Sequence, residues 1–202
     1  MSSSRYLYID TTHALQVGLM DDRFHFITKI KVTEGKSGSV IHQYINNLLI
    51  ENGLEPRDLS AIFVNNGPGS YTGVRVGEGI AKVFELDGGK VISFHEHEAV
   101  QSVTESGLWV ANAFKGEFFV HEWSNKLESK TQLVGREFFN RDFECDIFSN
   151  DLIEPIPVNK IYNSKEFLLE KSKMIFRTML KENLRKDTFY FRKSDEEFVV
   201  KK

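Results

Sequence analysis

The sequence predicts an α/β fold with two lobes, and the spacing of its apolar residues carries this prediction. Three runs with apolar residues at about every second position, residues 5–10, 14–20 and 24–32, indicate strands in a meander. A helix, a strand, a second helix and a further strand follow, an order typical of a sheet whose later strands are parallel. We place an N-terminal lobe at residues 1–105 and a smaller C-terminal lobe at residues 106–202.

The first lobe contains two amphipathic helices around an apolar strand. The first helix is expected from Ser37 or Ser39, either of which can cap its start, to the natural helix stop at Gly53. A glycine-rich loop leads into the second helix, which should end near Leu86. Strands are expected before and after this second helix, at residues 60–65 and 90–95.

The second lobe is predicted as short strands and one long helix. Residues 107–114 and 116–123 indicate a strand pair, and shorter strands are expected at residues 131–134 and 145–148. A single helix should run from Ser164 to about Leu184, because Asn163 and Glu166 have the spacing of a capping box. Its expected apolar contacts are Phe167, Leu168, Met174, Ile175 and Met179.

Composition restricts the classes of function that the chain can serve. The net charge is −3 and no basic stripe is evident before the C-terminal tail, so the chain alone should not bind nucleic acid tightly. The single cysteine, Cys145, excludes an internal disulfide and suits a reducing compartment. No apolar run approaches the ~18 residues of a membrane span, and none has the form of a signal peptide. We therefore expect a cytoplasmic protein without membrane contact.

The segment GPGSYTG, residues 67–73, raises the question of whether it binds a phosphate. A P-loop needs Lys and then Ser or Thr after its last glycine, where this sequence has Val74 and Arg75. The dinucleotide-binding pattern has Thr72 in place of its third glycine. An anion at the following helix N-terminus remains physically possible. The residues that would lie near a nucleotide are Asp10, Thr11, Gly67, Gly69 and Ser70.

Inside the second helix, Gly73, Gly77 and Ala81 have i, i+4, i+8 spacing and form a smooth stripe. A glycine inside a helix costs about 1 kcal/mol relative to alanine. Two of them on one face indicate that another backbone comes unusually close. The stripe is therefore a packing face, either internal or for a partner.

The segment GPGSYTGVRVG, residues 67–77, closely resembles the GPGSFTGxRxG signature of the TsaB (YeaZ) family of bacterial tRNA threonylcarbamoyladenosine biosynthesis proteins. LYIDTT, NAFKGEFFV and FYFRK are similar to three further family segments and occur in the family's order. Asn112 and Phe114 depart from the family's D-A-R pattern, and residues 125–185 show no match.

The resemblance implies an actin-like/Hsp70-like ATPase (ribonuclease H-like) fold with a mixed sheet, two lobes and a reduced second lobe. It also implies a non-catalytic scaffold subunit that pairs with a TsaD-type catalytic subunit, and a TsaE-type ATPase is a further candidate partner. ATP and metal are expected on the catalytic partner, tRNA only through the complex, and no tightly bound cofactor on this chain. A homodimer through the same helices is the other pairing considered.

The resemblance also assigns candidate site residues. The stripe becomes a docking surface for the partner, so Gly77→Leu should block pairing and leave the chain folded. The full set of expected interface residues is Gly73, Arg75, Gly77, Ala81, Tyr44, Ile45 and Leu48. Active members of the superfamily hold a Mg²⁺–water carboxylate at the position of Asp10, but a turn-capping role is favoured here.

Two other functions fit the sequence less well. A small ATP-dependent phosphotransferase of the same superfamily would need a second glycine-rich phosphate loop, whereas the later glycines, Gly107, Gly116 and Gly135, are isolated. A homodimeric adaptor unrelated to tRNA is the other alternative. No catalytic nucleophile is predicted, because Ser70 lacks the G-x-S-x-G context and Cys145 has apolar neighbours. No metal site is predicted either: the HEHE segment, residues 95–98, contains zinc-ligand types, but acidic residues at a strand-to-helix junction suit the positive helix end. The chain alone should not hydrolyse ATP.

Overall fold

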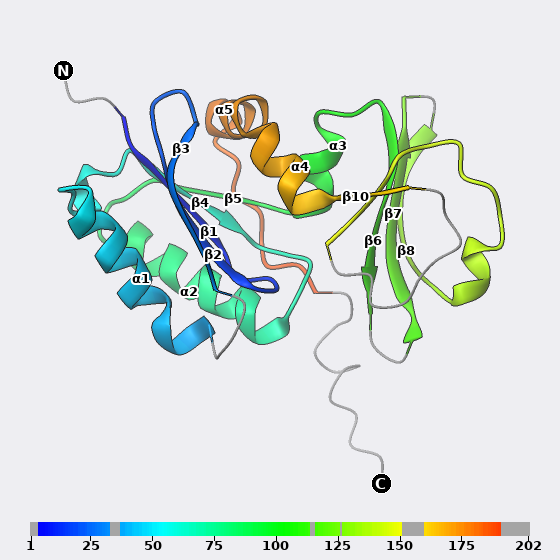
Figure 1. Cartoon of the computed structure of the whole chain (residues 1–202), viewed down its shortest axis with the longest axis horizontal. Helices are drawn as coiled ribbons and strands as arrows, with labels where there is room; N and C mark the ends of the chain where they lie inside the picture. The colour runs from blue at the N-terminus through cyan, green and yellow to red at the C-terminus, as the bar shows by residue number, and fades with distance from the viewer. Residues whose placement is uncertain (1–3, 33–36, 114–115, 126, 151–159, 191–202) are drawn as a thin grey trace, which may run out of the picture. The chain divides into compact units, whose positions relative to one another are not determined.

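The computed structural model describes residues 4–32, 37–113, 116–125, 127–150 and 160–190, without the side chains of residues 37–39 and 127. The chain divides into two compact units, the first comprising Met1–His95 and Ser172–Tyr190 and the second including Glu96–Lys171. Each unit holds one five-stranded mixed sheet with helices (Figure 1). The predicted two-lobe α/β fold is confirmed.

The sheet of the first unit has the strand order β3-β2-β1-β4-β5. An antiparallel meander joins β1, β2 and β3, and β4 and β5 extend the sheet in parallel from β1. This parallel extension follows from the intervening helices, which carry the chain back between strands. The strands are β1 (Tyr6–Asp10), β2 (Leu15–Met20), β3 (Phe26–Val32), β4 (Ala61–Asn65) and β5 (Val91–Phe94).

Helices cover both faces of this sheet. The helices α1 (Ser37–Glu51) and α2 (Tyr71–Leu86) lie together on one face, where Leu48 and Ala81 join the core formed by Ile9 and Ile62. A short 3-10 helix, Pro56–Asp58, precedes β4. The opposite face is covered by α5 (Ser172–Glu182), whose buried Phe176 contacts aromatic rings of β1, β4 and β5.

The second unit repeats the same sheet arrangement. Its strand order is β10-β9-β6-β7-β8, with an antiparallel meander of β6, β7 and β8 and parallel pairing of β9 and β10. Its strands are β6 (Ser106–Asn112), β7 (Phe118–Ser124), β8 (Leu127–Val134), β9 (Ile147–Ser149) and β10 (Ile161–Asn163). Its helices are α3 (Glu96–Gln101), the 3-10 helix Arg136–Phe139 and α4 (Ser164–Glu170). The three-residue β9 and β10 fit the expectation of a reduced lobe.

Three details of the predicted architecture are wrong. The units divide after His95, and not near residue 105, and residues 172–190 return to the first unit. The single long helix is two helices, because α4 ends at a turn at Lys171 before α5 begins. Met174, predicted as an apolar contact, is 56% exposed, since α5 buries its other face through Ile175 and Met179. Long-range packing decides each of these points.

Among the described residues, the structure has no helix of the length and apolar character needed to cross a membrane.

Candidate functional site

The glycine loop packs tightly against the end of β1. The amide of Ser70 donates a hydrogen bond to the carbonyl of Thr12 (2.7 Å), and a Cβ on Gly69 would collide with that same residue. Ser70 also caps α2, because its hydroxyl accepts a hydrogen bond from the amide of Gly73 (3.3 Å). The hydroxyl of Thr11 donates to the carbonyl of Gly73 (2.7 Å). These groups, predicted to lie near a nucleotide, hold the loop, β1 and α2 together.

Asp10 has the turn-capping role that the sequence favoured. Its buried carboxylate accepts hydrogen bonds from the amide (2.9 Å) and the hydroxyl (2.7 Å) of Thr12. The hydroxyl of Tyr8 and the side-chain amide of Asn65 each donate to its other oxygen at 3.2 Å. Asp10 therefore ties the first turn to the end of β4, and protein donors occupy both of its oxygens.

The stripe on α2 packs inside the first unit, which corrects the predicted docking surface. A Cβ on Gly73 would collide with the carbonyl oxygen of Thr11. A Cβ on Gly77 would lie 2.8 Å from Oγ1 of Thr11 and 3.4 Å from Cγ1 of Val64, and Ala81 is fully buried. The close backbone approach inferred from the glycines is real, but the neighbour is the chain's own β1 end. Gly77→Leu should therefore destabilise the chain itself.

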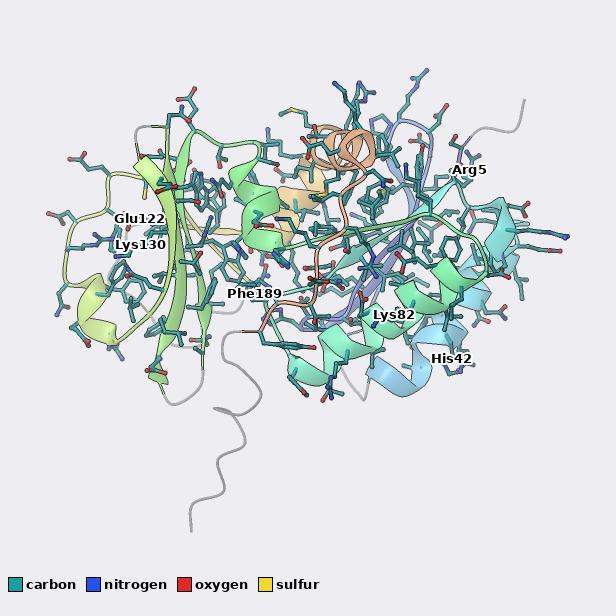
Figure 2. All side chains as sticks on the ribbon, turned by 180° about the vertical axis from the view of Figure 1, so that it is seen from behind. Arg5, His42, Lys82, Glu122, Lys130 and Phe189 are labelled. Carbon is teal, nitrogen blue, oxygen red and sulfur yellow. The ribbon has the colours of Figure 1, made fainter. Side chains whose placement is uncertain are left out.

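A C-terminal strap, residues 184–190, crosses the glycine loop from the other side. The amide of Phe189, labelled in Figure 2, donates a hydrogen bond to the carbonyl of Asn66 (2.8 Å). The carbonyl of Phe189 also fills the space that a side chain on Gly67, which has a φ of 116°, would need. At the start of α2, the rings of Tyr190 and Tyr71 lie 4.8 Å apart. The backbone of the strap therefore fills the space beside Gly67, the first glycine of the loop.

Arg185 fastens the strap to α2. Its guanidinium donates hydrogen bonds to Glu78 (2.8 and 3.0 Å) and to Glu85 (2.7 and 3.2 Å). Burial alone would raise the pKa of Glu78, but hydrogen bonds from Arg185 and Asn66 outweigh it and lower that pKa below its usual value. Hydrogen bonds to Glu85 and Glu78 likewise raise the pKa of Arg185. The strap therefore fixes α2 through charges that lie about two helical turns apart.

Arg185→Gln is expected to lower the free energy of unfolding by about 1–2 kcal/mol at neutral pH, because it leaves the largely buried Glu78 with only the exposed Lys82, 3.9 Å away, as a cation. The pKa of Glu78 is lower in the folded than in the unfolded chain. Ionised Glu78 therefore stabilises the fold at pH values above the ordinary carboxylate pKa. That contribution should disappear as the pH falls through the lowered value. Urea denaturation at neutral and acidic pH measures the difference. Arg57→Gln, which breaks an exposed pair with Glu55, should change stability far less.

Cys145 lies in the second unit beside the core of its sheet. Burial raises the pKa of its thiol, and nearby Glu122 adds to that effect. The reactive thiolate is therefore scarcer than in a free cysteine near neutral pH.

An apolar groove lies between α1 and α2 in the first unit and has a volume of about 900 Å³. Its floor is formed by Leu7 and Ile62 of the sheet, and Figure 2 shows the two helices that flank it. The α1 wall includes His42, Ile45 and Asn46. The α2 wall is formed by Val76, Gly79, Ile80, Val83, Phe84 and Leu86.

The α2 wall is suited to accept a further apolar surface. Val83 is 67% and Leu86 is 88% exposed, although both are large and apolar. A Cβ on Gly79 would meet nothing within 4 Å, so this glycine leaves space in the wall. Exposed apolar side chains gathered beside a groove are a usual mark of a protein-binding site.

The remaining predicted interface residues lie in different environments. Ile45 lines the groove, as an interface residue should. Leu48 is fully buried and cannot contact a partner directly. Tyr44 is half-buried against the core and lies outside the groove lining, so its place in an interface stays a prediction. Arg75 is exposed but stacks on the ring of Tyr71 (4.5 Å from its centre), outside the groove lining.

The sequence analysis did not name the groove residues Gly79, Val83 and Leu86, because it took the glycine face of α2 as the exposed one. A signal for them existed, since Val76, Gly79, Ile80 and Val83 have the i, i+3, i+4, i+7 spacing of an apolar face.

Comparison with known proteins gives a partial sequence match and a match over most of the fold. Residues 32–99, which span α1, β4, α2 and β5, match the TsaD family model, described as tRNA N6-adenosine threonylcarbamoyltransferase. YeaZ from Pseudomonas aeruginosa is similar in structure, with a TM-score of 0.54, 17% identity, and coverage of 72% of this chain and 75% of that one. No curated protein sequence matches the chain.

A second solved structure agrees with the first. A protein described as similar to peptidase YEAZ from Pseudomonas aeruginosa also has a TM-score of 0.54, with 18% identity and coverage of 72% of this chain and 74% of that one. The two YeaZ structures therefore share the fold of this chain, and the TsaD family model matches its α1–β5 segment.

Proposed function

We propose that this chain is the non-catalytic subunit of a pair that forms threonylcarbamoyladenosine in tRNA, and that the other member is a TsaD-type catalytic subunit. The observation that carries the proposal is the apolar groove between α1 and α2, with Val83 and Leu86 exposed on its wall. The TsaD family match supports a role related to this tRNA modification.

The proposed partner follows from the part of the chain that matches the TsaD model. That match, residues 32–99, contains both helices of the groove, so a TsaD-type subunit should carry a similar helix pair. Two like helix pairs can pack face to face as a four-helix arrangement, each filling the groove of the other. The same geometry would also allow two copies of this chain to pair, which the experiment below distinguishes.

The non-catalytic role is supported by how the loop and Asp10 are used. In active phosphate-binding loops, free backbone amides and a lysine hold the phosphates. Here Ser70 and Thr11 bind neighbouring protein groups, and the strap lies over Gly67. Asp10 accepts hydrogen bonds from protein donors. ATP and metal are accordingly assigned to the catalytic partner, with tRNA reached through the complex.

Val83→Asp with Leu86→Asp is expected to weaken pairing with the organism's TsaD-type subunit at least about 100-fold, because two charges would have to be buried in the interface. Melting of the isolated variant should stay close to that of the unchanged chain, since both side chains are largely exposed. Co-purification and calorimetric titration measure the pairing.

The matched control is Ile27→Asp with Met174→Asp, which adds the same charges at exposed apolar positions outside the groove lining and should retain pairing. Pairing that survives in the Val83/Leu86 variant would contradict the groove as the docking site. A chain that forms homodimers through the groove but binds no TsaD-type subunit would instead favour the adaptor alternative.

A further inference from the structure

A row of positive charge runs along the outer side of α5, on the sheet face opposite the groove. Lys173, Arg177 and Lys181 have i, i+4, i+8 spacing and are all exposed. The helix buries its opposite side through Ile175 and Phe176, so the three cations point to solvent. Successive cations are spaced about 6 Å apart along the helix, because each residue rises about 1.5 Å. This stripe was missed when the sequence was read as having no basic stripe before the tail.

Two further cations belong to the same face of the sheet. Strand register aligns Tyr8, Gly18 and Lys29 across β1, β2 and β3, and Lys31 follows two residues later on the same side. Tyr8 contacts Phe176 of α5, which identifies this side as the α5 face. Both lysines are exposed.

The start of α5 lies beside the β2–β3 hairpin. The hydroxyl of Ser172 donates a hydrogen bond to the carbonyl of Phe24 (3.0 Å), and Figure 1 shows β3 and α5 close together. The two elements therefore contribute to one surface of the first unit.

The five cations are not neutralised by the fold. Within the part of the chain that the structure describes, none of them forms an ion pair. The only acidic residue of α5 is Glu182, and β3 has none. A concentrated basic face in a chain with a net charge of −3 fits a partner with regularly spaced negative charges.

We propose that the outer side of α5 and the edge of β3 form a contact surface for the phosphate backbone of RNA. The inference rests on the proposed function, because the complex would bring the RNA to this face. Cations of this kind hold and orient the backbone without reading its sequence. Five of them supply too little binding for the chain alone, and they contribute when a partner binds the same RNA.

The test measures binding of an unmodified tRNA transcript to the assembled complex over a range of salt concentrations. The variant Lys173→Gln, Arg177→Gln, Lys181→Gln should bind the transcript at least about tenfold more weakly at low salt. Its slope of log affinity against log salt should be shallower by about 2–3, since each phosphate contact contributes about 0.7–0.9. Lys29→Gln with Lys31→Gln should reduce the slope in the same direction.

A second triple variant controls for the change in net charge. Lys90→Gln, Lys130→Gln, Lys160→Gln removes three exposed cations from other elements and should leave the slope unchanged. Equal slopes for the α5 variant and the unchanged complex would overturn the inference. It would also be overturned if the α5 substitutions weakened binding to phosphatidylserine vesicles and left RNA binding unchanged. Assembly is measured separately by co-purification. Failure to assemble would overturn the proposed function, whereas normal assembly with unchanged RNA binding overturns only the α5 surface.

Discussion

Gly73→Ala is expected to lower the free energy of unfolding by about 3 kcal/mol or more, the upper end of the range for overpacking. The reason is steric: the added methyl group would collide with the backbone carbonyl of Thr11, a residue that directly follows β1 and whose hydroxyl is hydrogen-bonded to α2. A flexible side chain could move aside, but a backbone oxygen at the end of a central strand cannot. Melting temperature should fall by roughly 6–12 °C at about 2–4 °C per kcal/mol for a chain of this size.

The same helix offers a control. A Cβ on Gly79 meets nothing within 4 Å, so Gly79→Ala should raise stability by about 0.5–1 kcal/mol through helix propensity alone. Thermal melting of the two alanine variants side by side separates steric conflict from propensity. If Gly73→Ala melted like the unchanged chain while losing its partner, the glycine stripe would be the docking surface after all.

Asp10→Ala is expected to cost about 3 kcal/mol or more, because several donors would be left without their acceptor in a buried place. The largest losses should come from the amide and hydroxyl of Thr12 and from the side chain of Asn65. Asp10→Asn keeps one acceptor oxygen for Thr12, so its cost should be clearly smaller. Chemical denaturation of both variants measures the series.

This series also discriminates the scaffold from a phosphotransferase. In the scaffold, the isolated chain hydrolyses no ATP above background, and Asp10→Ala acts on stability. ATP turnover by the isolated chain that disappears in an Asp10→Ala protein of normal stability would show that Asp10 serves a nucleotide-bound metal. The proposed non-catalytic role would then be wrong.

The order and type of the elements could be predicted from local patterns. Alternating apolar residues identify β2 and β3, and helical spacing identifies α1, because burial of one face requires that period wherever the element lies. A local hydrogen bond could be predicted in the same way at the Asn163 cap, whose side chain accepts from the amide of Glu166 (2.9 Å). These features depend on neighbours within a few residues.

The candidate site depended on contacts that sequence does not reveal. α2 carries two faces with helical spacing, one through Gly73 and Gly77 and the other through Gly79 and Val83, and periodicity fits both. Only the position of Thr11, some sixty residues earlier, decides which face is internal. The apolar residues of the C-terminal strap follow neither a strand nor a helix period. The strap lies beside Gly67 because of long-range hydrogen bonds and contacts.

The sequence by itself therefore determined the α/β class, the two-lobe organisation, the capping roles of Asp10 and Asn163, and the resemblance to the TsaB family. The tertiary structure decided that the glycine stripe is internal, that the groove lies on the other face of α2, and that residues 172–190 return to the first unit. The physical reason is the separation along the sequence over which each interaction acts. Backbone geometry and apolar period act between near neighbours, whereas the choice between two similar faces is made by whichever distant segment packs against one of them.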